Sequence, residues 1–329
     1  SHIIYGMQKT LSIINLPAIR ENALRIKALC GNKFFAVVKA DAYGHGAEEV
    51  SRYIEDIADG FCVAIIEEGI ALRVGGITKQ ILVLTPPLDS YDVSRAKAYN
   101  LTLTVNSIQS ATLLKGAECH IKVNTGMNRL GCDLSELPSI LKKLPPESID
   151  GVYSHLFAPQ DESACEFQFA VFERAARLVK TFKPCATAHL SASGGLLRGG
   201  KYLFDGVRSG ILLYGYAPAG FEAEGFKPAL KVFARRTQVT RFIGGGVGYN
   251  FADREYSTLT AYRCGYADGF SRTVPLGEKT LCMDAFVSTE NGNLACVMDD
   301  ADEYAKRCGT ISYEVLTSVT RRSERIYER

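Results

Sequence analysis

Short apolar runs alternate with amphipathic helical segments along most of this 329-residue chain. The runs are rich in β-branched and aromatic residues, which is typical of buried strands. They are Phe34–Lys39, Phe61–Ile66, Ile81–Leu84, Leu101–Val105, His120–Asn124, Gly151–His155, Ala186–Leu190 and Gly206–Tyr214. Helical patterns such as Pro17–Leu29 and Ser163–Val179 separate them. Strands that alternate with helices indicate parallel βαβ units, and this series predicts a closed (β/α)8 TIM barrel.

An open, doubly wound sheet is the alternative to the barrel. Such a sheet normally carries a glycine-rich loop after its first strand. In this chain Asp41-Ala42-Tyr43 follows the first predicted strand instead, which favours the barrel. We therefore assign residues 10–225 to the barrel domain.

The residue pattern changes beyond residue 225. Strand-like runs then follow one another with turns between them: Lys231–Phe242, Ser257–Cys264, Thr280–Ser288 and Leu294–Met298. Asp300–Arg307 is the one segment here with a helical pattern. We expect a smaller, mainly β domain over residues 226–329. A strand pattern also covers Tyr5–Ile14, and the N-terminal strand at residues 1–9 could join either domain.

Composition and charge limit the class of protein. With 47% hydrophobic and 22% charged residues the chain has an ordinary globular composition, and its net charge of +2 gives no reason to expect nucleic acid or a membrane as partner. No apolar stretch approaches the roughly 20 residues of a membrane span. The ten cysteines are scattered without zinc-ligand spacing, and only five histidines are present. We expect no metal site, and free thiols in a reducing, cytoplasmic compartment.

Lys39 is the first candidate for chemistry, because it ends the first predicted strand. An amine at the exit of a buried strand is partly desolvated, which lowers its pKa and suits a Schiff-base lysine. The alternative is a lysine that extends from the strand end into solvent. The residues alone leave both interpretations open.

Other polar residues follow the same ends of later strands, where barrel enzymes place their active sites. Lys122 with Arg129, His155 and Arg208 fall at these ends. The serine- and glycine-containing loops after strands seven and eight suit a phosphate group, although each alone could be an ordinary turn. A phosphate site combined with a Schiff-base lysine indicates pyridoxal 5'-phosphate as cofactor.

Several motifs resemble those of alanine racemases, and they occur in order along nearly the whole chain. They are Ala36–Gly46 (AVVKADAYGHG), Lys122–Gly131 (KVNTGMNRLG), Val207–Ile211, Gly248-Tyr249, Gly265–Gly269 (GYADG), Cys282–Asp284 and Gly309–Glu314 (GTISYE). The resemblance implies a fold-type III pyridoxal-phosphate enzyme, built from a barrel and a C-terminal β domain. It also implies a head-to-tail homodimer with shared active sites.

The resemblance assigns roles to the polar residues. It implies that Lys39 carries the cofactor and is one of two catalytic bases, and that Tyr249 of the other subunit is the second. Racemisation needs such a pair, since a proton leaves Cα on one face and returns on the other. Arg208 would face the pyridine nitrogen and His155 would orient Arg208. Arg129 would bind the cofactor's phenolic oxygen and the substrate carboxylate.

The remaining assignments concern the phosphate group and the substrate entrance. By resemblance, the phosphate is bound by Tyr43, Ser193, Gly210 and Ile211. The substrate entrance is lined from the other subunit by Tyr266, Met283 and Asp284. Lys122 matches a lysine that is carbamylated in many members of the family; an unmodified lysine is the alternative.

The chain also departs from the family pattern. Asn124 stands where an aspartate is usual, no asparagine precedes Ser193, and the stretch from Arg272 to Cys282 is short. Arg321 occupies the position of a tyrosine beside the substrate pocket. This more polar residue raises the alternative of a serine, or dual serine/alanine, racemase of the vancomycin-resistance type, whose racemase domain follows a membrane domain.

The leading hypothesis is an alanine racemase that supplies D-alanine for peptidoglycan. A non-catalytic pyridoxal-phosphate protein is a further alternative, but such proteins have a single domain, and the region after residue 228 argues against it. An amino-acid decarboxylase of the same fold would place a carboxylate at the pyridine nitrogen, where this chain has Arg208.

Overall fold

The computed structural model describes residues 10–279 and 281–329, and the strand expected at residues 1–9 lies outside this range. The chain forms two compact units. The larger comprises Ile19–Ala42 and Ala47–Lys227, and the smaller comprises, among the described residues, Thr10–Ala18, the short segment Tyr43–Gly46, and the described part of Pro228–Arg329. The two units are described separately below.

The larger unit is a parallel barrel, as predicted. Its strands form the sheets β4-β3-β2-β9 and β5-β6-β7-β8. A bridge between Leu82 and Thr102 joins β4 to β5, and the Arg208 N–H donates to the Ser191 carbonyl at 3.0 Å on the seam between β8 and β9. The strands are β2 (Lys33–Val37), β3 (Gly60–Val63), β4 (Gln80–Val83), β5 (Leu103–Val105), β6 (Cys119–Lys122), β7 (Ile149–Tyr153), β8 (Thr187–His189) and β9 (Gly206–Ser209). The last predicted strand is wrong beyond Ser209, because Ile211–Tyr214 forms the 3-10 helix η3.

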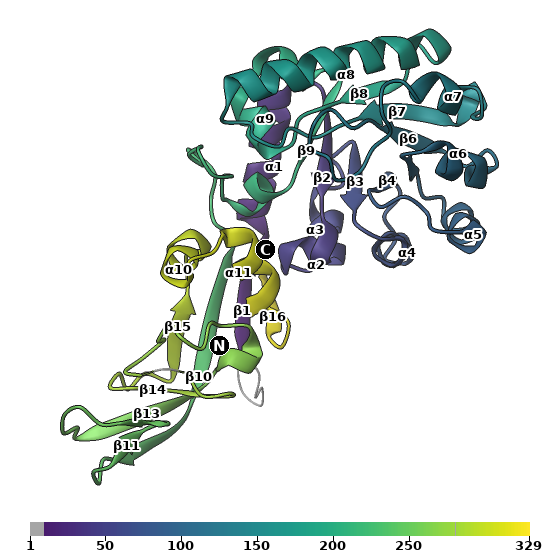
Figure 1. Ribbon diagram of the computed structural model, residues 1–329. Helices are drawn as coiled ribbons and strands as arrows, with labels where there is room; N and C mark the ends of the chain where they lie inside the picture. The colour runs from purple at the N-terminus through teal and green to yellow at the C-terminus, as the bar shows by residue number, and fades with distance from the viewer. Residues whose placement is uncertain (1–9, 280) are drawn as a thin grey trace. The chain divides into compact units, whose positions relative to one another are not determined.

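Helices lie around these strands (Figure 1). They are α1 (Leu16–Cys30), α3 (Ala47–Ile54), α4 (Ile66–Val74), α5 (Ser90–Ala98), α6 (Ile108–Leu114), α7 (Leu137–Leu141), α8 (Glu162–Phe182) and α9 (Ser193–Arg198), with the 3-10 turns η1 (Pro146–Ser148) and η2 (Gly200–Leu203). Side-chain caps fix several starts; for example, Asp89 accepts from the backbone of Tyr91 and Asp92 before α5. Helix α8 buries Cys165, Gln168, Phe172, Ala175 and Val179 on one face, at the spacing of an amphipathic helix.

The smaller unit is built on a mixed sheet of order β14-β13-β10-β1-β16, with β15 also paired to β10. The strands are β1 (Leu11–Asn15), β10 (Leu230–Arg241), β13 (Thr258–Arg263), β14 (Phe286–Ser288), β15 (Leu294–Met298) and β16 (Glu324–Glu328). Strand β1 runs antiparallel to β10 and parallel to β16. Residues 11–15 therefore lie in the smaller unit, although we assigned the chain from residue 10 onwards to the barrel.

The helical content of the smaller unit exceeds the expectation. The predicted helix is present as α10 (Ala301–Cys308), and Gly309 in a left-handed conformation ends it. A second helix, α11 (Ser312–Val319), follows, and the sequence analysis missed it. Its β-branched residues favour a strand locally, but Val315, Leu316 and Val319 are buried together. Tertiary burial therefore decides the conformation of this segment.

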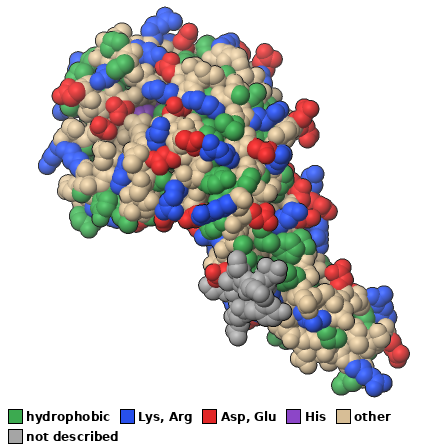
Figure 2. All heavy atoms as spheres, turned by 180° about the vertical axis from the view of Figure 1, so that it is seen from behind, with side chains coloured by type: hydrophobic (Ala, Val, Ile, Leu, Met, Phe, Trp, Pro, Cys, Tyr) green, Lys and Arg blue, Asp and Glu red, His purple; other side chains and the backbone are tan. Residues whose placement is uncertain are grey.

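Two features bear on possible partners. Acidic and basic side chains are interspersed over the face of the larger unit in Figure 2. Among residues 10–279 and 281–329, no helix combines the length and the apolar character that crossing a membrane requires.

Asn22 on α1 provides a test of the larger unit. It is 1% exposed, its Nδ2 donates to the carbonyls of Leu213 and Lys227 at 3.1 and 2.8 Å, and its Oδ1 accepts from the Lys227 N–H at 2.9 Å. We predict that Asn22→Ala lowers the free energy of unfolding by about 2–4 kcal/mol, because buried backbone groups lose their partners. Urea denaturation measures this loss.

Glu21→Ala is the matched control for Asn22→Ala. Glu21 is the neighbouring residue and also reaches Lys227, but through an exposed ion pair. Its removal should cost less than about 1 kcal/mol. Equal losses for the two variants would contradict the role given to Asn22.

Candidate active site

The predicted residues of the barrel lie at the carboxyl ends of its strands, which we call the barrel mouth. Lys39 follows β2, Lys122 ends β6, His155 follows β7, and Arg208 is part of β9. Arg129 lies in the loop after β6. In a parallel barrel all these ends share one rim, and the electrostatic interactions below show that their charges influence one another.

Positive charge dominates the barrel mouth. Burial lowers the pKa of Lys122 to about 7, with Arg208, Arg129 and Lys39 as further causes. Burial and then Arg129 lower the pKa of Lys39, while Glu68 raises it. The side chains thus repel each other as cations. The barrel mouth is therefore suited to an anionic ligand, and it makes the ammonium forms of its two lysines less favourable than in water.

Arg208 is 3% exposed and has its donors engaged. Its Nη1 donates to the His189 carbonyl at 2.7 Å and lies 2.8 Å from His189 Nδ1. Its Nη2 donates to the Ser154 carbonyl at 2.5 Å and the Leu190 carbonyl at 3.3 Å. His189 is therefore a histidine that contacts Arg208 directly, and the chain after β7 contributes its Ser154 carbonyl. The orienting role expected of His155 stays a prediction; the charge of Arg208 is one cause that lowers the pKa of His155 to about 3, after burial.

A second buried histidine extends this contact. His120 Nδ1 lies 2.7 Å from His189 Nε2, and burial lowers the pKa of His120 to about 3, so the imidazole is neutral. A guanidinium can only donate. His189 Nδ1 must then accept from Arg208, and His189 Nε2 must donate to His120 Nδ1. The proton of His120 consequently sits on Nε2, which has no partner among the described residues.

Two hydroxyl groups and a backbone amide lie close together where the chain leaves β8 and β9. Ser193 Oγ lies 2.9 Å from Ser209 Oγ, and the Gly210 N–H donates to Ser193 Oγ at 3.2 Å. Ile211 continues from Gly210 as the start of η3. Tyr43, the other residue expected at the phosphate, belongs to the smaller unit, where its ring centre is 5.9 Å from that of Tyr313.

Gln168 connects the loops after β6 and β7. This fully buried side chain on α8 donates to Thr125 Oγ1 at 2.9 Å and to the His155 carbonyl at 2.8 Å. Its Oε1 accepts from the Phe157 N–H at 3.0 Å. The sequence analysis missed this residue and His189. A polar residue on the apolar face of α8 was the available signal for Gln168.

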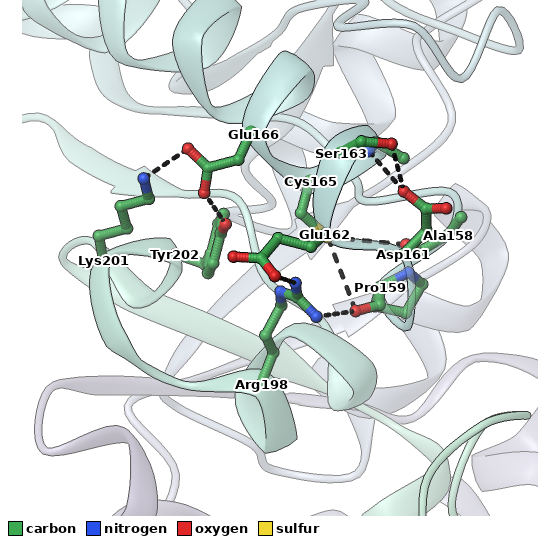
Figure 3. Close-up of polar contacts among 11 residues, drawn as sticks. Ala158, Pro159, Asp161, Glu162, Ser163, Cys165, Glu166, Arg198, Lys201 and Tyr202 are labelled. Carbon is green, nitrogen blue, oxygen red and sulfur yellow. Dashed lines mark hydrogen bonds and ion pairs between the residues drawn. The ribbon is translucent and has the colours of Figure 1, made fainter.

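Polar contacts connect α8, and the loop that precedes it, to α9 and η2 (Figure 3). Lys201 Nζ lies 2.6 Å from Glu166 Oε2, and the Tyr202 hydroxyl also contacts Glu166. Arg198 at the end of α9 donates to the Pro159 carbonyl at 3.2 Å. These contacts join α8 and the loop before it to α9, which begins at Ser193, and to η2, which follows α9.

The chain after Lys39 adopts a left-handed helical turn. Ala40, Asp41, Ala42 and Tyr43 have φ of 52–54°, a region that costs residues other than glycine about 1–2 kcal/mol each. Such strain persists only where the surroundings enforce it, and it gathers at functional sites.

The smaller unit holds the other predicted residues. Tyr249 is 88% exposed at the tip of the hairpin formed by β11 (Gly246–Val247) and β12 (Asn250–Phe251). Tyr266 starts the 3-10 helix η4 (Tyr266–Asp268), and Met283 is half-exposed. Asp284 pairs with Arg322 at 3.0 Å. Arg321 is exposed and its Nε donates to the Thr317 carbonyl at 3.2 Å.

Solved structures with the same fold define the class of protein. The biosynthetic alanine racemase of Pseudomonas aeruginosa aligns with a TM-score of 0.83 and 28% identity over 98% of this chain and 100% of its own. The alanine racemase of Bartonella henselae with covalently bound pyridoxal phosphate gives 0.83 and 28% over 97% and 99%. These are likenesses over essentially the full length of both chains.

Sequence comparison narrows the class to a family. The family model of the alanine racemase N-terminal domain matches residues 14–218. The alanine racemase of Carboxydothermus hydrogenoformans is 33% identical over 373 aligned positions, covering 98% of this chain and 100% of that protein. That of Streptococcus agalactiae is 35% identical over 286 positions, covering 80% and 76%. The chain belongs to the alanine racemase family.

The left-handed turn predicts that an Ala→Gly substitution stabilises the protein there, whereas the same substitution in a right-handed helix destabilises it. Ala40 is exposed with φ 52° and ψ 48°, so Ala40→Gly should remove strain and stabilise the protein by up to about 1 kcal/mol. Ala71, exposed in the right-handed helix α4, is the control, and Ala71→Gly should destabilise by about 0.5–1 kcal/mol. Thermal and urea unfolding measure both. A destabilising Ala40→Gly would argue against strain in the turn.

Proposed function

We propose that this protein is a pyridoxal-phosphate-dependent racemase that interconverts L- and D-alanine. Membership of the alanine racemase family supports the reaction. The observation in the structure that carries the proposal is the amine of Lys39 at a cationic barrel mouth, with Arg129 and Arg208 in electrostatic range. Serine racemisation remains a sequence-based alternative that no contact of Arg321 favours.

The side chains of the barrel fit this cofactor. An anionic ligand would relieve the repulsion among the cations of the mouth, and the Ser193–Ser209 pair with the Gly210 N–H offers neutral donors to a phosphate. Lys39 would hold the cofactor covalently. Arg208, Arg129, Ser193, Gly210, Ile211 and Tyr43 would hold it non-covalently. When bound, pyridoxal phosphate withdraws electrons from the substrate Cα and makes its proton acidic.

Lys39 and Tyr249 are the groups we propose to move that proton. The lowered pKa of Lys39 makes a neutral amine accessible, which can take the Cα proton on one face. The Tyr249 phenol would give or take a proton on the other face. Its 88% exposure at a hairpin tip is unusual for a catalytic group within one chain. We therefore propose that Tyr249 acts in the active site of a second copy, in a head-to-tail homodimer.

Arg208 would keep the pyridine nitrogen unprotonated, because a guanidinium has no acceptor for a proton. Its bonds to His189 and to three backbone carbonyls hold its plane. Arg129 would bind the substrate carboxylate. Tyr266, Met283, Asp284 and Arg321 are proposed to line the substrate entrance.

The function is tested with the purified protein and added cofactor. Lys39→Ala should abolish the visible absorption band of bound cofactor, and the wild type should convert L-alanine to the D-enantiomer. Tyr249→Phe should keep the band but lower kcat by about 10²-fold or more in at least one direction. Tyr256→Phe, which removes a hydroxyl that donates to Asp253 in the same unit, is the control and should retain activity. A protein that stays colourless with cofactor refutes the proposal.

Lys122 is proposed to be carbamylated. With a pKa near 7, its neutral amine can attack CO2, forming an N–C bond while two protons leave the original ammonium. The product is an anion. The modified Lys122 would then attract Arg129 and Arg208, whereas the ammonium form repels them.

This modification predicts a pH-dependent signal. In ¹³CO2-equilibrated protein, ¹³C NMR should show a carbamate carbon that is absent in Lys122→Ala. The signal should fade as the pH drops below about 7, because protonated amine cannot react. Lys180→Ala, which removes an exposed lysine paired with Asp205, should leave the signal intact. An identical spectrum for wild type and Lys122→Ala would exclude the carbamate.

A further inference from the structure

A carboxylate from a neighbouring βα unit holds the chain just after Lys39. Glu68 lies in the first turn of α4. Its Oε1 accepts from the Ala40 N–H at 2.7 Å, and its Oε2 accepts from the Ala64 N–H at 2.7 Å and the Ile65 N–H at 3.4 Å. One side chain thus ties the residue after Lys39 to the loop that follows β3.

The chemistry of these bonds makes a glutamate hard to replace. Both carboxylate oxygens are engaged with backbone donors, and charge-assisted bonds of this kind are stronger than neutral ones. A carboxylate is also favoured in the first turn of a helix. The amide of a glutamine would offer one acceptor and would turn its NH2 group toward an N–H.

The segment that Glu68 holds is the left-handed turn, which needs external support. Inside it, the Ala42 N–H donates to the Val38 carbonyl at 2.8 Å. At its far side, Asp41 Oδ1 accepts from the Ala47 N–H at 2.7 Å, at the start of α3. Two carboxylates therefore fasten the turn, one at its entry and one toward its exit. The Glu68 bond is the one adjacent to Lys39.

Glu68 also acts on the charge of the amine. Among the causes that shift the pKa of Lys39, burial and Arg129 lower it, and Glu68 is the largest that raises it. The charge of the Glu68 carboxylate therefore affects the pKa of the Lys39 amine. This electrostatic effect is separate from the hydrogen bonds that the carboxylate accepts from the backbone.

We infer that Glu68 is a positioning residue for Lys39, whose carboxylate holds the strained turn so that the amine stays in the barrel mouth. Its consequence for catalysis rests on the proposed function; the fastening of the turn does not.

The first arm of the test measures the turn itself. Hydrogen–deuterium exchange with mass spectrometry on the full chain with cofactor should show at least about tenfold faster exchange across residues 38–47 in Glu68→Gln. Glu67→Gln is the matched control: it is the adjacent residue on the same helix, exposed, and its contact is a surface pair with Arg95. It should exchange as the wild type does. Wild-type exchange in Glu68→Gln would overturn the inference, whatever reaction the protein catalyses.

The second arm measures the amine. In Glu68→Gln, kcat should fall about 10- to 100-fold with little change in KM, as small misplacements of a reacting group do. The acidic limb of the kcat pH profile should move to lower pH, because kcat reports the enzyme–substrate complex, in which Lys39 acts as the free base, and the group that raises its pKa is gone. Adding Ala40→Gly should restore part of kcat, since glycine adopts the left-handed turn without a clamp.

The outcomes separate the two proposals. A wild-type protein without racemase activity refutes the proposed function but leaves the exchange result meaningful. Faster exchange with an unchanged kcat and pH profile refutes the positioning role. If Glu68→Gln does not fold, Glu68→Asp, which shortens the reach of the carboxylate, is held to the same exchange and kcat expectations. Its acidic limb should stay near that of the wild type, because the charge is kept.

Discussion

The buried guanidinium of Arg208 is the contact on which the geometry of the barrel mouth depends. Burying an ion costs several kcal/mol unless new partners replace its hydration. Here the carbonyls of Ser154, His189 and Leu190 supply those partners. They follow β7 and β8, whereas Arg208 belongs to β9 and pairs in register with Phe35 of β2. Arg208 therefore links the chain at the ends of β7 and β8 through its side chain, and β2, the strand that leads to Lys39, through its backbone.

The surroundings of that cation divide into charged and neutral groups. Lys39 and Lys122 have lowered pKa values because burial and the arginines disfavour their ammonium forms. His120 and His189 are neutral for the same reasons. The arginines thus keep their charge, while burial and their repulsion make the neutral forms of the neighbouring lysines and histidines easier to reach. A reaction that needs a neutral amine beside permanent cations requires this separation.

The sequence was sufficient to predict the barrel, because strand and helix patterns are local and repeat. It also predicted the cations of the mouth, since each follows a strand. It did not reveal that His189 contacts Arg208, because His189 ends one strand and Arg208 lies in the next, and only the closed barrel brings the two side chains together. Gln168 was missed because its role depends on two loops meeting at one helix. Helix α11 was missed because burial of its apolar face outweighs local propensity.

The pairing of β1 with β16 has a consequence for how the chain folds during synthesis. Residues 11–15 align with residues 324–328 as neighbouring parallel strands. Strand β1 can therefore pair with β16 only once residues 324–328 have been synthesised, whereas the barrel strands end at Ser209. Contacts so distant in sequence form slowly. The strands of the barrel are therefore all available more than a hundred residues before the sheet of the smaller unit can be completed.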